Sequence, residues 1–190
     1  PGMSIVGIAN PDLKWEKNKT WNIGLDLSFI DRISVTFDYY QRKTSDLIYD
    51  LPVSQVGGYY DGNYGYTTPQ NIGSLKNSGF ELTITSTNFR NKDFTWTTSL
   101  NMAHNSNKLT ELDGQQNEIV SGPLIHRVGE PYYSYYVYEY AGVDAETGKE
   151  MFYLNDGTEN ARKTTTNISE ANKTIVGKHQ ASIEGGLTNN

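Results

Sequence analysis

The sequence contains no cysteine among its 190 residues, so neither a disulfide framework nor a thiolate metal site is possible. It also lacks any run of about 18 apolar residues, which excludes a membrane-spanning helix. Basic residues are outnumbered, because 16 Lys and Arg stand against 22 Asp and Glu and give a net charge of -6. Since neutralising phosphates needs a basic surface, we expect no nucleic-acid partner.

The composition is that of a two-faced sheet. Only 36% of the residues are hydrophobic, yet Tyr occurs 14 times and Gly 18 times. Aromatic residues make up 12% and charged residues 20%, which argues against intrinsic disorder. A polar, aliphatic-poor and Tyr-rich chain is typical of a sheet with one wet face and one apolar face.

Strict alternation of apolar and polar residues defines four segments. In residues 21–29 every odd position is apolar and every even position is polar or Gly. Residues 33–40, 80–85 and 94–102 repeat the alternation, with Thr98 as a polar residue on the apolar side. A helix would not give a period of two, so the pattern predicts antiparallel strands. Two further strands, with less regular alternation, are predicted at residues 131–141 and 178–187.

The connections between these segments alternate in length. Ile30–Arg32 and Arg90–Asp93 are short polar links of the kind found in hairpins, whereas 44–77 and 106–130 are long. Compact soluble domains rarely carry two loops beyond about 15 residues, but outer-membrane barrels have short turns at one end and long loops at the other. We therefore predict both short turns at one end of the sheet and Tyr59–Tyr66 at the opposite end.

Two folds remain open on patterning alone. The expected class is all-β, with antiparallel up-and-down strands that form part of a large transmembrane β-barrel. Strands that end in aromatic residues (Trp21, Phe29, Phe94 and Trp96) fit the interfacial girdles of such a barrel. A soluble β-sandwich gives the same alternation. The two differ in what covers the apolar side of residues 21–29, which is lipid in the barrel and a second sheet in the sandwich.

Several motifs occur in a fixed order along the chain. Residues 10–17 read NPDLKWEK and are followed by NIGLD at 22–26, DYYQRKTSDL at 38–47 and NIGSLKNSGFEL at 71–82. Residues 94–105 then read FTWTTSLNMAHN. In sequence and spacing these motifs resemble those of the SusC-like TonB-dependent outer-membrane transporters, from a C-terminal part of the barrel. The resemblance is dense over residues 10–157.

The resemblance implies a barrel of about twenty-two strands closed around a plug. Such transporters lie in the bacterial cell outer membrane, surrounded by outer-membrane lipid, and import oligosaccharides or peptides. They work with a SusD-like surface lipoprotein as a lid and receive energy from TonB, which touches the plug. Residues 1–190 are then expected to be a segment of the barrel domain, with the plug and the remaining strands outside them.

No catalytic or metal-binding pattern is found, and we expect neither an enzyme nor a cofactor. His104, His126 and His179 lack metal-ligand spacing, so each is expected to be a hydrogen-bonded surface residue. Residues 153–163 depart from the acidic, Gly-rich stretch common in the resembled family, which argues against a divalent-ion site there.

The best candidates for contact with a ligand or a lid are Tyr59, Tyr60, Tyr64 and Tyr66, which stand among Gly and Asn residues. Flat aromatic rings stack on sugar C–H surfaces and their hydroxyls add hydrogen bonds. The same tyrosines could instead pack the loop on itself or line the aromatic belt. In the alternative function, a soluble carbohydrate-binding module, they would form the binding platform.

Overall fold

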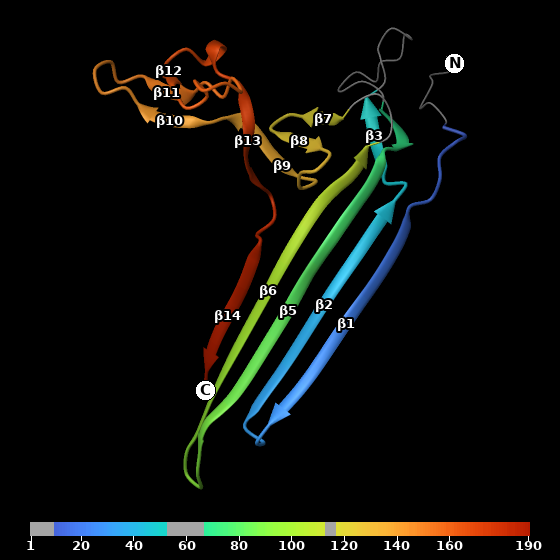
Figure 1. Cartoon of the computed structure of the whole chain (residues 1–190), viewed down its shortest axis with the longest axis vertical. Helices are drawn as coiled ribbons and strands as arrows, with labels where there is room; N and C mark the ends of the chain where they lie inside the picture. Colours follow the sequence, from blue (N-terminus) through green and yellow to red (C-terminus); the bar gives the residue numbers. More distant parts are fainter. Residues whose placement is uncertain (1–9, 53–66, 113–116) are drawn as a thin grey trace, which may run out of the picture.

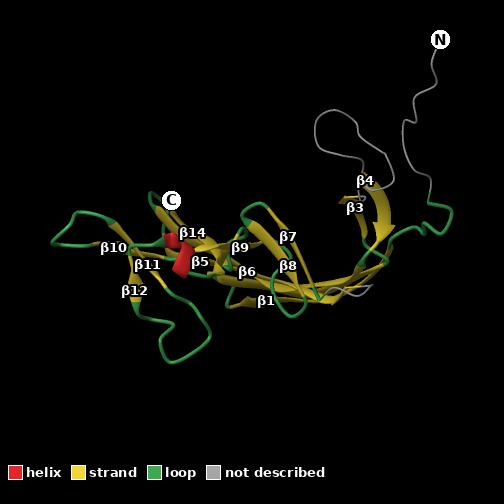
Figure 2. Cartoon of the chain, turned by 90° about the horizontal axis from the view of Figure 1, so that it is seen from above, coloured by secondary structure: helices red, strands yellow, loops and turns green. Residues whose placement is uncertain are grey.

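The computed structural model describes residues 10–52, 67–112 and 117–190. Its main feature is a five-stranded antiparallel sheet of long strands in the order β1-β2-β5-β6-β14 (Figure 1). Their bounds are β1 Lys17–Phe29, β2 Ile33–Ser45, β5 Gly73–Arg90, β6 Thr95–Leu112 and β14 Ile183–Asn189. The four strands predicted from strict alternation are confirmed as parts of β1, β2, β5 and β6. Seen from above, the sheet follows a shallow arc, as a segment of a barrel wall does (Figure 2).

Shorter strands gather at one end of this sheet (Figure 1). A hairpin of β3 (Ile48–Pro52) and β4 (Thr67–Asn71) extends it beyond β2. The other short strands form two small sheets in the orders β13-β9-β8-β7 and β10-β11-β12. Their bounds are β7 Glu118–Ser121, β8 Leu124–Arg127, β9 Ser134–Tyr138, β10 Tyr140–Val143, β11 Glu150–Tyr153, β12 Thr164–Thr165 and β13 Lys173–Lys178, with a short 3-10 helix at Ile168–Glu170. None of the helices in the described ranges is long and apolar enough to cross a membrane.

Two expectations about the connections need correction. The segment 44–77 is not one long loop, because it contains β3 and β4, and 106–130 holds the end of β6 together with β7 and β8. The predicted strand at 131–141 forms as β9 and β10, which lie in the small sheets rather than in the long one. These short strands pair away from the two-faced sheet, so they do not show its alternation. The predicted strand at 178–187 is split between the last residue of β13 and most of β14.

The predicted position of the short turns is confirmed. Ile33, the first residue of β2, pairs with Ser86 near the end of β5, so the β1–β2 and β5–β6 turns lie at the same end of the sheet (Figure 1). Ile30 and Asp31 adopt positive φ values of 51° and 52° in the first turn. Residues 59–66 lie outside the described residues, but β3 and β4, which flank them, are at the opposite end.

Strand register gathers the apolar residues on one face. Leu27 pairs with Val35, Val35 with Ile84, Ile84 with Leu100 and Leu100 with Leu187, so one apolar row crosses all five strands. We call this side the outer face. The next two rows, on the side away from the short turns, continue the apolar surface with the following residues: Ile23, Leu25, Phe37, Tyr39, Phe80, Leu82, Met102 and Ile183.

The outer face is exposed in the described part of the chain. Ile23 is 63% exposed and Leu25 51%, and no second sheet among the described residues covers them. A soluble sandwich would cover this face with a second sheet, so the described residues do not form that alternative fold. Exposure of such a wide apolar surface is what a lipid-facing barrel wall requires.

Aromatic side chains border the outer face at both ends. Towards the short turns lie Phe29, Phe94 and Trp96, and the rings of Phe94 and Phe89 are 5.9 Å apart. Towards the other end, the rings of Trp21 and Tyr39 are 5.4 Å apart. Two aromatic borders around an aliphatic band correspond to the two girdles of a membrane barrel.

The motif around Asn71 forms the junction between the hairpin and the long sheet. The Asn71 amide donates to the carbonyl oxygens of Asp46, at 2.7 Å, and of Lys14, at 2.9 Å, and its oxygen accepts from the Lys14 N–H. Asp46 has a φ of 58° and its carboxylate pairs with Lys17 at 2.9 Å. At Gly73, φ is 145° and a Cβ would come within 2.0 Å of the Glu111 carbonyl oxygen, so only glycine fits.

The two faces make opposite predictions for neighbouring residues of β5. Leu82 is on the outer face and Thr83 on the other, at the same height on the strand. Leu82→Arg places a charge in lipid without a partner and should cost about 2–4 kcal/mol in the assembled barrel, whereas Thr83→Arg should be tolerated. The measurement is the amount of each folded variant of the full-length protein recovered from membranes. Equal recovery would contradict the assignment of the faces.

Candidate functional site: the polar inner face

The side of the sheet opposite the outer face is polar, and we call it the inner face. Its residues are hydrogen-bonded across the strands: the Thr36 hydroxyl donates to Asp26 at 2.8 Å, and the hydroxyls of Thr85 and Ser99 are 3.2 Å apart. In the row next to that of Asp26 and Thr36, Asp38 pairs with Glu81, so further carboxylates lie on this side. Side chains of this kind suit the water-filled interior of a barrel.

A glycine in β5 allows a tyrosine to cross the inner face. Tyr40 of β2 pairs with Gly79, and its hydroxyl donates to the side-chain oxygen of Asn105 on β6. A Cβ at Gly79 would lie 2.3 Å from the His104 carbonyl oxygen and 2.7 Å from the Tyr40 hydroxyl oxygen. The absence of a side chain at Gly79 therefore lets the Tyr40 ring lie across β5 and link three strands.

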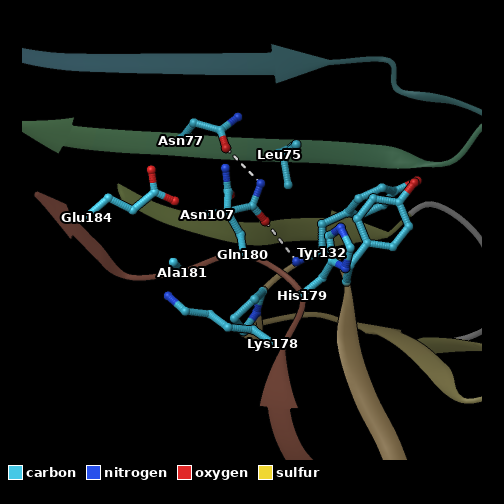
Figure 3. A pocket seen from close by; sticks show the side chains of 11 residues that line it. Leu75, Asn77, Asn107, Tyr132, Lys178, His179, Gln180, Ala181 and Glu184 are labelled. Atoms are coloured by element: carbon cyan, nitrogen blue, oxygen red, sulfur yellow. Dashed lines mark hydrogen bonds between the residues drawn. The ribbon is translucent and has the colours of Figure 1, made fainter. Parts of the chain in front are cut away.

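Two adjoining hollows lie at the end of the inner face away from the short turns. One has a volume of about 550 Å³ and the other about 510 Å³, and both are lined by Asn77 and Gln180. Figure 3 shows the first, in which side chains from β5, β6 and the segment after β13 converge. The second hollow is also lined by Asn22, Tyr40, Arg42 and Asn105, and the first by Asn107, Tyr132, Tyr133, Lys178, His179 and Glu184.

A chain of amides forms the wall between β5 and the small sheet. The Asn107 amide donates to the Asn77 oxygen at 2.7 Å, and the Asn107 oxygen accepts from the Tyr132 N–H at 2.8 Å (Figure 3). Each side-chain amide offers both donors and an acceptor, so it can match either a peptide group or a sugar hydroxyl. The amides of the hollows thus suit polar ligand groups that both donate and accept hydrogen bonds.

An aromatic cluster supports this wall from the small sheet. His126 of β8 is only 1% exposed, and its ring stacks on Tyr132 with the centroids 4.4 Å apart. Tyr49 of β3 and Tyr133 meet the same ring edge-on at 5.4 and 5.3 Å. Nδ1 of His126 donates to the Tyr132 carbonyl oxygen. Burial lowers the pKa of His126, although this hydrogen bond acts in the opposite direction.

The outcome for the predicted site residues is mixed. Tyr59, Tyr60, Tyr64 and Tyr66 lie outside the described residues, so their role stays a prediction. The expectation of a surface position for His126 is wrong, because Tyr49 approaches from a distant hairpin and covers it.

Nor do the other two histidines join His126 in a metal site. His179 lies near Tyr135, 3.3 Å from its hydroxyl, and His104 lies on the outer face opposite Phe80. Among the described ranges there is no group of three or more His, Asp or Glu side chains placed to hold a metal ion.

The two hollows themselves were missed at the sequence level. Asn101, Asn105 and Asn107 alternate on β6, and this spacing places them together on the inner face. Asparagine at alternating positions is the signal that could have pointed to an amide-lined surface. Gln180 carries no such signal, because it reaches the site from an irregular segment between β13 and β14.

Comparison with known proteins agrees with this geometry. Residues 1–182 match the family model described as TonB dependent receptor-like, beta-barrel. The chain therefore belongs to this family of β-barrel receptors, and its predicted likeness to SusC-like transporters is confirmed.

Particular relatives cover nearly all of the chain. It is 35% identical over 99% of its length to TonB-dependent receptor P3 of Formosa agariphila, and 36% identical over 94% to TonB-dependent receptor SusC of Bacteroides thetaiotaomicron. Among solved structures, the RagAB peptide transporter matches 98% of the chain at 33% identity, with a TM-score of 0.83. The chain spans only 20%, 18% and 20% of these three proteins, respectively.

The buried histidine predicts a pH-dependent opening of the small sheet. An unfolded histidine has a pKa of about 6.5. Because the pKa of His126 is lowered in the fold, the stability that its burial provides is complete above that pH and is lost as the pH falls below it. Between pH 6.5 and 5.5, exchange of the β8 amide hydrogens, corrected for the intrinsic rate, should rise by up to about tenfold.

Two variants test the origin of this effect by hydrogen exchange on the full-length protein. His126→Phe keeps an aromatic ring in the cluster and should remove the pH dependence. His104→Phe, on the outer face of β6, is the control and should retain it. A pH dependence that persists in His126→Phe would show that another group is responsible.

Proposed function

We propose that the chain is a segment of a larger outer-membrane β-barrel that imports oligosaccharides or peptides in a TonB-dependent manner. The observation that carries the proposal is the two-faced sheet, which has an exposed apolar face and an amide-lined inner face within one strand register. The outer face suits lipid, and the inner face suits the passage of a polar solute. A transporter of this kind binds and releases its cargo without changing it, so we infer no enzymatic activity.

The unpaired edges of the long sheet support the view that further strands belong to the barrel. Within the described residues, β1 and β14 each have a strand neighbour on one side only. Free edges of long strands inside a membrane leave backbone N–H and C=O groups without partners, which a closed barrel avoids. We infer that the plug and the other strands lie outside residues 1–190 and that TonB acts on the plug.

The relatives support both a substrate class and a partner. One structural neighbour is described as a peptide transporter and one relative is SusC. The amide-lined hollows accept hydrogen-bonding patterns of either peptides or sugars. A SusD-like surface lipoprotein as a lid is the partner that we propose, at the end of the strands where β3, β4 and the small sheets gather.

Cell fractionation and uptake test the proposal at the level of the whole protein. The full-length protein should be recovered in the bacterial outer membrane, together with a lipoprotein that co-purifies in mild detergent. Deletion of its gene should abolish uptake of at least one oligosaccharide or peptide mixture, and so should collapse of the inner-membrane proton gradient. Recovery in the soluble fraction would contradict the proposal.

The hollows give a more local prediction. Asn22 and Gln180 line them without a side-chain hydrogen bond to the described part of the chain, so replacement by Ala should leave the fold intact. Each lost hydrogen bond to a substrate is worth about 0.5–1.5 kcal/mol, so Asn22→Ala with Gln180→Ala should raise the apparent KM of uptake by about 5- to 150-fold. Uptake rates measured against substrate concentration give this value.

The matched control lies on the outer face. Gln41 and Ser78 pair with one another there, outside the hollows. Gln41→Ala with Ser78→Ala should leave the apparent KM unchanged at the same protein level. An equal change in both double variants would show that the hollows do not contact the substrate.

A further inference from the structure

A row of four lysines crosses the outer face. Lys19 pairs with Lys43, Lys43 with Lys76, and Lys76 with Lys108, so one lysine from each of β1, β2, β5 and β6 stands side by side. All four side chains belong to exposed residues. We call them the lysine row. With strands about 4.8 Å apart, the four residues span about 14 Å along the barrel circumference.

Repulsion within the row is not offset by nearby carboxylates. Like charges directly opposite one another on neighbouring strands are destabilising. The ion pairs among the described residues join Lys17, Arg127 and Arg162 to carboxylates and include none of the row. Between the row and the short turns, the long strands present no Asp or Glu on the outer face. Their carboxylates in this region, Asp26, Asp38, Glu81 and Glu184, are all on the inner face.

The first carboxylates beyond the row, on the side away from the short turns, are engaged elsewhere. Asp46 directly follows β2 and its carboxylate pairs with Lys17 at 2.9 Å. Glu111 lies past Lys108 on β6, opposite Ser74, and accepts a hydrogen bond from the Ser74 hydroxyl at 3.3 Å. Four adjacent positive charges therefore face outwards without a counter-charge from the described part of the chain. A cluster of like charges of this kind creates a positive potential that attracts anions.

The height of the row identifies the anion. The next row towards the short turns is Trp21, Gln41, Ser78 and Ser106, and the apolar band begins directly after it. At about 3.3 Å per residue, Lys19 lies about 33 Å along β1 from Phe29, or about 25 Å along the membrane normal at the usual strand tilt. That distance is the height of the apolar band of a membrane barrel, so the lysine row lies at headgroup level.

We propose that the lysine row binds phosphate groups of lipid headgroups in the membrane leaflet on the side away from the short turns. Long lysine side chains next to an apolar surface extend their ammonium groups to the headgroup region, where each anionic contact stabilises binding. Four lysines in line can hold two or more phosphates at once. The inference rests on the proposed place of the barrel in a membrane, and it assigns a specific lipid contact to one part of its wall.

Binding of a phosphorylated lipid tests the row in the full-length protein in neutral detergent micelles. The probe is a fluorescent lipid with a phosphomonoester headgroup, and its dephosphorylated form is the reference. The row variant carries Lys19→Gln, Lys43→Gln, Lys76→Gln and Lys108→Gln. At about fivefold per lysine, it should bind the phosphorylated probe about 600-fold more weakly than the unmodified protein.

The control variant removes the same charge elsewhere. Lys14→Gln, Lys92→Gln, Lys149→Gln and Lys163→Gln change four exposed lysines outside the row and should alter probe affinity by less than about twofold. Replacing the row by arginine should restore binding. Equal loss in the row and control variants, or equal binding of the dephosphorylated probe, would overturn the proposal. Displacement of the probe by inorganic phosphate at the same concentration would assign the row to free anions instead.

Thermal unfolding separates a lipid site from a purely structural role. Without anionic lipid, the row variant should unfold at the same temperature as the unmodified protein or higher, because repulsion has been removed. With phosphorylated lipid, the order should reverse. A lower unfolding temperature of the row variant in neutral micelles would overturn the proposal. Substrate uptake is measured separately, so a failure of the transport proposal leaves this result readable.

Discussion

The pairing register between neighbouring strands is the constraint on which the whole sheet depends. Because side chains alternate between faces, a shift by one position would move Asp26, Asp38 and Glu81 from the inner face into the apolar band. Charges in lipid have neither water nor partners there. The irregularities between β5 and β6 lie at Ser74/Leu75 and at Thr87/Phe89, near the two ends of the strands. The pairing across the apolar band itself is uninterrupted.

This constraint explains which parts of the fold could be predicted from sequence. A strand with lipid on one side and water on the other must alternate apolar and polar residues. The strands β1, β2, β5 and β6 could therefore be predicted from the alternation in residues 21–29, 33–40, 80–85 and 94–102. The small sheets follow no such rule. For example, β13 pairs with β9 through Lys173 and Tyr138, and no local sequence pattern indicates this pairing. The motif at Asn71 is visible in the sequence. The hydrogen bonds of Asn71 to Lys14 and Asp46, which explain why asparagine is needed there, are visible only in the structure.

The candidate site follows the same division. Alternating Asn residues on β6 could be assigned to one face from sequence, whereas the hollows need Gln180 and Tyr132 from separate segments. The burial of His126 depends on Tyr49, which belongs to the β3–β4 hairpin and is far from His126 in the sequence. Side chains that meet through tertiary packing leave no periodic signal. The contact of Tyr59, Tyr60, Tyr64 and Tyr66 with a ligand or a lid stays a prediction.

The late return of β14 to the sheet sets an order of assembly. Asp26 and Thr36, which are linked across β1 and β2, are 10 residues apart, whereas Thr98 and Asn189, linked across β6 and β14, are 91 apart. Hairpins close in microseconds, but contacts of long sequence separation form slowly because loop closure must come first. Among the pairings of the described sheet, that of β6 with β14 should therefore form last during insertion, and until then this edge of β6 stays open. A foreign strand that captures this edge would trap the protein before the wall is complete.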